Sequence, residues 1–314
     1  MHTSVLLHEA VEALAIKPGG IYVDGTFGRG GHSRMVLSLL DERGRLIALD
    51  KDPAAITFGG MLQDERFSIH HCGFSFMQQK LLQLGIEAVD GILLDLGVSS
   101  PQLEETLRGF SFRLAGPLDM RMDTSRGQTA AEWLAVVSED QLERVIRDYG
   151  EERYARQIAR AIIVARTRQP IVTTLQLAEI VAAVVRARQS RRETVRHPAT
   201  RTFQAIRIYI NQELEELSLA LPQCVDLLKP GGRLVIISFH SLEDRMVKQF
   251  IRKASTVDEP PRGIPMPESE IQRLSKPALK RIGQAIHPGS NEVEENVRAR
   301  SAVMRVAEKQ FYPG

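Results

Sequence analysis

Apolar runs of strand length alternate with helix-like segments along the first hundred residues. Four of these runs are expected to form strands, at residues 21–23, 45–49, 67–70 and 89–95, and a fifth strand is expected much later, at residues 233–239. The segment at residues 33–40 has helical spacing, and Asp52-Pro53 is a typical helix start, with a capping side chain followed by Pro. Nearly continuous apolar strands separated by helices are typical of a parallel sheet that is covered on both faces. The pattern therefore predicts an α/β fold with a doubly wound, mostly parallel, Rossmann-like sheet.

A long helical segment interrupts this alternation after Asp95. Between residues 103 and 197 the apolar positions recur with a helical period, and Thr129 and Ser138 each stand where a capping side chain begins a helix. Residues 103–197 are therefore expected to form an all-helical domain inserted into the sheet domain.

The sheet pattern returns after this insertion. The run at residues 233–239 predicts a fifth buried strand, and residues 300–306 alternate between apolar and polar positions as an edge strand does. We therefore assign residues 1–102 and 198–314 to one α/β domain.

The turn after the first strand carries the most informative chemistry. Gly28 and Gly30 lie between a strand and a helix, where bare backbone at a helix N-terminus can receive a ligand. Asp50 ends the second strand, 20 residues beyond Gly30, and a carboxylate there can accept hydrogen bonds from both hydroxyls of a ribose. The spacing predicts a nucleoside cofactor; the alternative is an ordinary αβ turn without a ligand.

Neighbouring residues favour S-adenosylmethionine over other nucleosides. A dinucleotide fingerprint needs a third Gly where this chain has Ser33, and no Gly-Lys-Ser/Thr follows the turn as in a P-loop. Asp24, at the tip of the first strand, would repel a pyrophosphate but attract the ammonium and sulfonium groups of S-adenosylmethionine. A nicotinamide-dependent oxidoreductase is the alternative enzyme, although the sequence shows no His-Asp or Tyr-Lys pair for hydride transfer.

Composition indicates a globular protein of about two domains at ~150 residues each. Of the 314 residues, 43% are hydrophobic and 25% are charged, which suffices for a packed core. Cys72 and Cys224 form no CxxC pair and suit a reducing compartment. The first residues lack the basic start of a signal peptide, and no apolar run approaches the ~18 residues of a membrane span. We expect a cytoplasmic protein without a membrane partner.

Positive charge is concentrated in one part of the chain. Residues 144–207 contain 14 Arg, no Lys and 5 acidic residues, a net charge of +9, which leaves −7 for the remainder of a chain whose total is +2. An Arg-rich module is typical of a surface that binds RNA phosphates in bidentate fashion. The alternative is a set of salt-bridged helix faces.

The segment after the fourth strand offers groups that could hold a methyl acceptor. Asp95 follows that strand, and Ser99, Ser100 and Pro101 supply hydroxyl and carbonyl oxygens that could orient an exocyclic amine for in-line attack. In the structural alternative the two Ser cap the next helix and Pro101 lies in its first turn. No His/Cys/carboxylate cluster has the spacing of metal ligands, so no metal is expected.

Motifs over nearly the whole chain carry a family resemblance. They are HTSVLL at residues 2–7, DGTFGRGGHS at 24–33, DGILLDLGVSSPQ at 90–102, RGFSF at 108–112, GPLDMRMD at 116–123, YGEER at 149–153, HPATRTFQA at 197–205 and SFHSLEDR at 238–245. With these motifs the chain resembles the bacterial 16S ribosomal RNA cytosine-N4 methyltransferases, a group of class I S-adenosylmethionine enzymes.

This resemblance implies methylation of N4 of a cytidine in the decoding region of the small ribosomal subunit. It implies S-adenosylmethionine as cofactor, 16S rRNA within that subunit as partner, no obligate protein partner, and RNA recognition by the helical insertion. With Asp24 and Gly28 of the turn, the expected cofactor contacts are Gly30, Gly31 and His32, Asp50 on the ribose, and Phe74, Asp95 and Gln102 around the adenine side. A ribosome assembly factor that binds RNA without catalysis is the alternative outside enzymology.

Candidate residues for catalysis and RNA binding follow. Those for catalysis are Asp95, Ser99, Ser100, Pro101 and His240, and those for RNA are Phe110, Phe112, Arg188, Arg191, Arg192 and Arg201. Generic amino-methyltransferases carry an aromatic residue where this chain has Gln102, so the ring that stacks on the cytosine is sought among Phe110, Phe112, Phe239 and His240. In the structural alternatives the two former Phe pack in a core, and His240 is a loop residue beside a helix capped by Ser241. His197 lies where the chain returns from the Arg-rich segment, and for this residue a local structural role is as well supported as a functional one.

Overall fold

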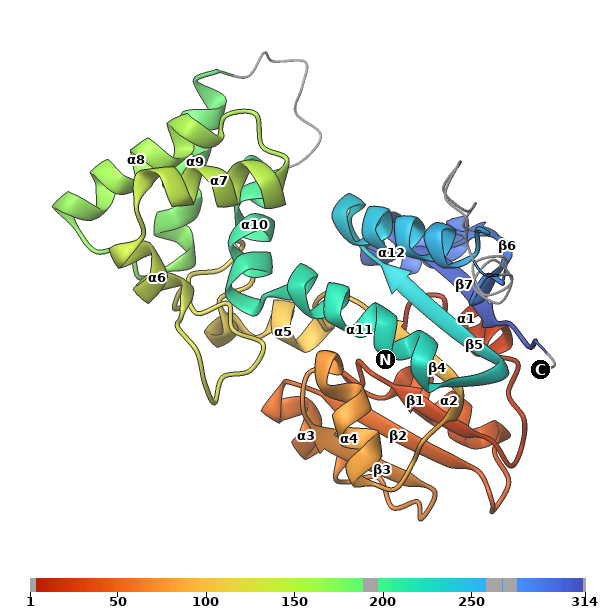
Figure 1. Ribbon diagram of the computed structural model, residues 1–314. Coiled ribbons are helices and arrows are strands. Elements are labelled where there is room, and N and C mark those ends of the chain that lie inside the picture. The colour runs from red at the N-terminus through yellow and green to blue at the C-terminus, as the bar shows by residue number, and fades with distance from the viewer. Residues whose placement is uncertain (1–3, 189–196, 258–266, 268–275, 313–314) are drawn as a thin grey trace. The chain divides into compact units, whose positions relative to one another are not determined.

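The chain forms two compact units (Figure 1). A computed structural model describes residues 4–188, 197–257, 267 and 276–312. The sheet unit consists of Met1–Gly97 and Leu214–Gly314, and the helical unit consists of Val98–Glu213. No helix among the described residues is both long enough and apolar enough to cross a membrane.

A seven-stranded sheet organises the sheet unit, with the strand order β3-β2-β1-β4-β5-β7-β6. Its strands are β1 (Ile21–Asp24), β2 (Arg45–Asp50), β3 (Phe67–His71), β4 (Val89–Asp95), β5 (Leu228–Ser238), β6 (Leu279–Ile286) and β7 (Val303–Lys309). Strands β1 to β5 are parallel, and β7 runs antiparallel to both of its neighbours. The prediction of a doubly wound, mostly parallel sheet is confirmed.

Helices cover both faces of this sheet (Figure 1). They are α1 (Leu7–Ala13), α2 (Gly31–Leu39), α3 (Pro53–Gly59), α4 (Met77–Gln83), α11 (Glu213–Leu227), α12 (Ser241–Ala254) and α14 (Ser290–Glu295), with short 3-10 turns η1 (Phe74–Phe76) and η3 (Val297–Ser301). Within β4, Ile92 and Leu94 pack with α4, α11 and α12, whereas Leu93 packs with α1 and α2. Successive strand residues point to opposite faces, so burial on both faces explains the nearly continuous apolar run.

Strand β7 corrects one sequence-based prediction. The alternating segment near residues 300–306 was expected at an edge of the sheet, but β7 lies between β5 and β6, and β6 is the edge strand. Met304 and Val306 are buried, while Arg305 between them is held by Asp244 of α12, with Nε 2.7 Å from Oδ1. An inner strand can therefore carry a charge at alternate positions, because α12 supplies the counter-charge.

The helical unit contains the expected all-α insertion. Its elements are α5 (Ser100–Glu104), η2 (Thr106–Arg108), α6 (Ala130–Val136), α7 (Glu139–Gly150), α8 (Ala155–Arg168), α9 (Thr174–Arg186) and α10 (Thr200–Asn211). Thr129 and Ser138 cap α6 and α7 as predicted: their side-chain oxygens accept hydrogen bonds from the backbone N–H groups of Glu132 and Gln141. A buried apolar core joins these helices.

The helical unit is wider than the predicted range of residues 103–197. Helix α10 belongs to it, because Phe203 and Ile206 are buried in the same core as α7 and α8. Asn211, at the end of α10, also donates to the Met120 carbonyl and accepts from the Met122 N–H, both at 2.7 Å. These contacts join segments about ninety residues apart in the chain, so no local pattern announces them.

Candidate cofactor site and RNA-binding residues

Three carboxylates lie at the tips of adjacent parallel strands in the sheet unit. Asp50, Asp24 and Asp95 end β2, β1 and β4, which are neighbours in that order. Burial raises the pKa of each carboxyl above its ordinary value, and the charge of Asp24 raises the pKa of the other two further. The pKa of Asp50 reaches about 6. Three neighbouring carboxyls, one buried and two half-buried, favour a positively charged ligand.

The glycine turn has the backbone conformation that its sequence suggests. Gly28 and Gly30 have positive φ values of 55° and 68°, where side chains are strained. A Cβ on Gly30 would also lie 2.6 Å from the ring of Phe27. Asp50 fixes the turn from the next strand, because its Oδ2 accepts the Gly28 N–H at 2.7 Å. Gly31 begins α2, and a Cβ there would collide with the side chain of Ser4.

Asp24 is bound on both of its oxygens by the protein itself. Oδ1 accepts the Thr26 N–H at 3.1 Å, and Oδ2 accepts the Ser33 hydroxyl at 2.6 Å. The side chain is 3% exposed. Asp24 thus holds the turn against α2, and the attraction of its charge for the ammonium and sulfonium groups of the cofactor stays a prediction.

One carboxylate oxygen of Asp95 receives no hydrogen bond from the described residues. Its N–H donates to the Thr26 hydroxyl at 2.6 Å, and its Oδ2 lies 3.7 Å from Nδ1 of His32. Oδ1 is buried and has no hydrogen-bond partner among the described residues, although 24% of the side chain is exposed. A buried acceptor without a donor is costly unless a ligand supplies one. The site therefore fits a ligand that carries N–H groups and positive charge.

Phe74 lies beside the tip of β1. It begins η1 directly after β3 and is buried in the main core of the sheet unit. A Cβ placed on Gly25 would lie 3.2 Å from the Cβ of Phe74, so this Gly allows the close approach. The position beside the strand tips suits contact with a nucleoside, and the cofactor contact that the resemblance implies for Phe74 stays a prediction.

The Ser99–Gln102 segment forms a helix cap, as the structural alternative predicted. Ser99 is the N-cap of α5, and Oε1 of Gln102 accepts the Ser99 N–H at 2.9 Å. Ser100 and Gln102 are buried, and Pro101 lies in the first turn. The expected role of this segment in orienting an amine stays a prediction, as does contact between Gln102 and the cofactor.

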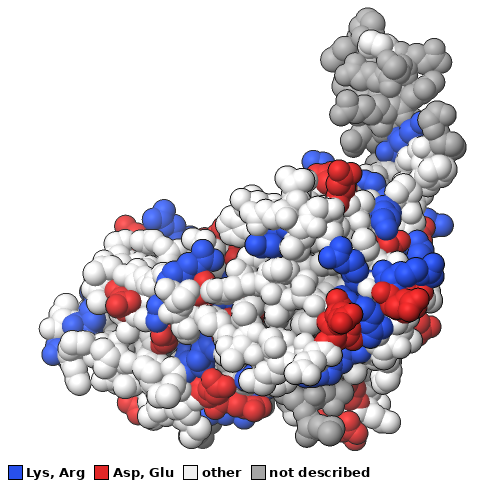
Figure 2. Space-filling model, turned by 90° about the horizontal axis from the view of Figure 1, so that it is seen from below, with Lys and Arg blue, Asp and Glu red and all other residues white. Residues whose placement is uncertain are grey.

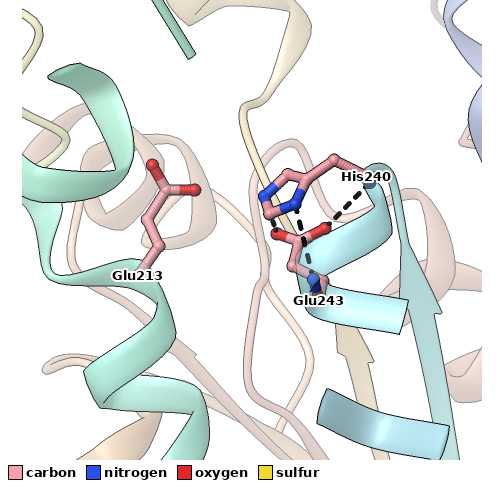
Figure 3. A group of neighbouring side chains, drawn as sticks. All are labelled: Glu213, His240 and Glu243. Atoms are coloured by element: carbon pink, nitrogen blue, oxygen red, sulfur yellow. Dashed lines mark hydrogen bonds and ion pairs between the residues drawn. The ribbon is translucent and has the colours of Figure 1, made fainter. Parts of the chain in front are cut away.

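His240 caps helix α12, so the structural alternative, which placed the cap at Ser241, was wrong by one residue, and a catalytic role for His240 stays a prediction. Nδ1 of His240 accepts the Glu243 N–H at 3.4 Å, and Nε2 lies 3.2 Å from Oε1 of Glu243 (Figure 3). Oε2 of Glu243 in turn accepts the Phe239 N–H at 2.8 Å. An imidazole can stand where a Ser would normally cap because its unprotonated nitrogen also accepts a hydrogen bond. Figure 3 also labels Glu213, whose carboxylate is bound within the helical unit by two N–H groups of Arg207, each at 2.8 Å.

The two candidate stacking rings of the helical unit have different surroundings. Phe110 is 6% exposed and belongs to the core, which favours its packing alternative. Phe112 is half-buried, and its ring stacks on the exposed His197 with centroids 4.4 Å apart. Phe112 also contacts Phe203 edge to face. Of the two, Phe112 is the ring near solvent.

Of the candidate arginines that the structure describes, one is near a carboxylate and one is exposed. Arg188 is exposed, and Arg201 lies 4.0 Å from Glu152. Arg191 and Arg192 lie outside the described residues. On α8, Arg156 and Arg160 are exposed and have no ion pair or hydrogen bond of their side chains with any described residue. On the face of the molecule drawn in Figure 2, positive and negative side chains are interspersed.

Comparison with known proteins identifies the family. Residues 1–310 match the family described as the MraW methylase family. The chain belongs to the MraW methylase family. It is 65% identical over 308 residues to a protein of Nitrosospira multiformis named "Ribosomal RNA small subunit methyltransferase H", with 98% of this chain and 97% of that protein covered. A protein of the same name from Nitrosomonas eutropha is 64% identical over 309 residues, with the same coverage.

Membership of the MraW methylase family makes the chain a methyltransferase with S-adenosylmethionine as its cofactor. The sequence reasoning missed three residues that shape the site: Val5, Thr26 and Ser33, of which the last was noted only as a missing Gly. Ser33 donates its hydroxyl to the Asp24 carboxylate, the Thr26 hydroxyl accepts the backbone N–H of Asp95, and Val5 binds His32 through its carbonyl. Hydroxyls flanking a glycine turn were a usable signal for Thr26 and Ser33, because buried polar groups need hydrogen-bond partners. A backbone carbonyl leaves no such signal.

Proposed function

We propose that this methyltransferase transfers a methyl group from S-adenosylmethionine to N4 of a cytidine in 16S rRNA, within the decoding region of the small ribosomal subunit. The observation that carries the cofactor part is the cluster of strand-tip carboxylates in which Oδ1 of Asp95 has no hydrogen-bond partner within the described part of the chain. The RNA part is supported by the names of the relatives and by the charge of residues 144–207. A cytoplasmic location agrees with an rRNA substrate.

Residues of the sheet unit would hold the cofactor. Asp50 would accept the ribose hydroxyls, and the backbone of Gly28 and Gly30 would leave room for the ligand beside α2. Asp95 would receive the positively charged methionine end, while Phe74 would lie against the adenine. The bound cofactor supplies an activated methyl group on a sulfonium, so the protein mainly has to align the acceptor with it.

Residues of the helical unit would hold the RNA. Exposed arginines such as Arg188 and Arg201 would bind phosphates, and Phe112 is better placed than Phe110 to stack on a base. Unstacking the target cytosine costs a few kcal/mol, an order of magnitude typical of flipped bases. Ser99 and the residues after it would orient N4, and the surplus proton would leave to a loop oxygen or to water.

Transfer of a labelled methyl group tests this proposal. Small subunits from cells that lack the enzyme would be incubated with the full chain and methyl-labelled S-adenosylmethionine, and the rRNA would be digested to nucleosides. We expect label in N4-methylcytidine from 16S rRNA. Binding of both cofactor and subunits without any transfer of label would favour the non-catalytic assembly factor, and label in another nucleoside would overturn the assignment to N4.

A further inference from the structure

His32 is a buried histidine whose tautomer is fixed by its contacts. It lies in the first turn of α2 and is 5% exposed. Its Nε2 is 3.2 Å from the carbonyl oxygen of Val5, and because a carbonyl can only accept, Nε2 must donate. Burial lowers the pKa of His32 to about 4, so the ring is neutral near pH 7. Nδ1 consequently presents a lone pair.

That lone pair faces a carboxylate. Nδ1 of His32 lies 3.7 Å from Oδ2 of Asp95. A lone pair and an anionic oxygen repel each other in a buried place, unless a proton lies between them. The pKa of Asp95 is raised well above its ordinary value by burial and by the charges of Asp24 and Glu243. The position of Nδ1 of His32 and the neighbouring negative charges thus both favour a protonated Asp95 carboxyl.

We propose that His32 is a positioning residue for Asp95, that the Asp95 carboxyl keeps a proton beside the unprotonated Nδ1 of His32 before the cofactor binds, and that this proton leaves when the cationic S-adenosylmethionine binds. The inference deepens the proposed function and depends on its cofactor assignment, but not on its RNA substrate.

The surroundings of Asp95 leave the ligand as the source of positive charge. Among the described residues, the charged groups that act on this carboxyl are Asp24 on β1 and Glu243 on α12, both acidic. His240 is turned toward Glu243, and Asp50 acts on the cluster through Asp24. A ligand bearing an ammonium and a sulfonium would therefore change the proton affinity of Asp95 strongly.

The chemical balance of this step is simple. The O–H bond of the Asp95 carboxyl breaks, its proton passes to solvent, and the carboxylate remains beside the cationic ligand. After methyl transfer the product S-adenosylhomocysteine keeps the ammonium but has a neutral sulfur. The product should consequently expel less of the proton than the substrate does.

Calorimetry in buffers of different ionisation enthalpy tests the proposal with the full chain. Titrations with S-adenosylmethionine and with S-adenosylhomocysteine at several pH values from 5 to 8.5 give the number of protons released. We expect S-adenosylmethionine to release up to about one proton, at least twice as many as S-adenosylhomocysteine releases. Its affinity should rise up to about tenfold per pH unit. Equal release with both ligands, or none with either, would overturn the proposal.

Three variants separate the pair from its surroundings. Asp95→Asn removes the titrating group and should abolish the release. His32→Asn brings an amide N–H that can donate to an ionised Asp95, so release should fall at least twofold while the ligand still binds. His70→Asn is the matched control, because His70 is a partly buried histidine on β3 whose ring bonds Ser68 at 3.1 Å, and its release should equal that of the natural chain.

A second substitution at His32 guards against a folding defect. His32→Gln can still donate to the Val5 carbonyl but places no acceptor opposite Asp95, and it should also lower the release at least twofold. If both His32 variants fold and release as much as the natural chain, His32 has no positioning role. If S-adenosylmethionine does not bind the natural chain at all, the cofactor assignment fails with it; binding without release overturns this inference and leaves the proposed function intact.

Discussion

The two units of this chain show their chemistry to different degrees in the sequence. In the sheet unit, the residue that ends each parallel strand lies at the carboxyl edge of the sheet. Asp24, Asp50 and Asp95 could therefore be placed at the same edge from the sequence. In the helical unit, Phe110 lies outside the helices, so no period assigns its side chain to a face, and it proved to be a core residue. Parallel sheets therefore convert sequence order into position, whereas helical packing depends on contacts between distant segments.

The largest expected effect tests whether the units are energetically separate. Ile158 is fully buried in the core of the helical unit, and Ile92 is fully buried in β4. Replacing either by Ala should cost about 2–5 kcal/mol, because the transfer energy is lost and a cavity remains. We expect Ile158→Ala to leave the cofactor dissociation constant unchanged and Ile92→Ala to weaken binding. Differential scanning calorimetry with and without cofactor measures both; an equal loss of affinity in the two variants would contradict the separation.

The difference between the units also explains what sequence reasoning found and missed. The strand tips, the turn at Gly28 and Gly30, and the caps at Thr129 and Ser138 were predicted because each depends on residues within a few positions. The limits of the helical unit were not, because Asn211 bonds backbone groups about ninety residues away. The unmet oxygen of Asp95 was equally invisible, since it depends on which donors reach it in space.

Removal of the Asp50 carboxylate should have the next largest effect. Asp50→Ala removes the acceptor proposed for the ribose hydroxyls and also frees the Gly28 N–H that it binds. We expect cofactor affinity to fall by about 1–3 kcal/mol, the usual cost of leaving a hydrogen bond to a charged group unmet. Isothermal titration calorimetry at pH 7.5 measures the change. Asp64→Ala, which removes a carboxylate paired with Arg66 on the same unit, is the control and should bind normally.

Acidification should weaken cofactor binding through the same carboxyl. The pKa of Asp50 is raised to about 6, so the group is ionised above that pH and becomes protonated below it. A cationic ligand that hydrogen-bonds to the ionised form must expel the proton, and affinity should fall up to about tenfold per pH unit below pH 6. Asp50→Asn should remove this part of the pH dependence. A natural chain whose affinity is constant between pH 7 and 5 would contradict it.

The smallest expected effect concerns the helical unit and its arginines. Arg156 and Arg160 on α8 are exposed and unpaired among the described residues, whereas Arg147 on α7 is paired with Asp148 at 3.0 Å. Changing Arg156 and Arg160 together to Gln should lower RNA affinity severalfold. If both contact single-stranded phosphates, the slope of log affinity against log salt should become shallower by about 0.7 per contact.

Arg147→Gln is the matched control, because its charge is already offset by a neighbouring carboxylate and should release few counterions. Filter binding of small-subunit rRNA at several salt concentrations measures both. Equal slopes in the natural chain and the double variant would mean that these arginines solvate a helix face, and the positive charge of residues 144–207 would then be structural at α8. A shallower slope would instead extend the electrostatic prediction from the composition of the segment to two named side chains, the step that periodicity alone could not make.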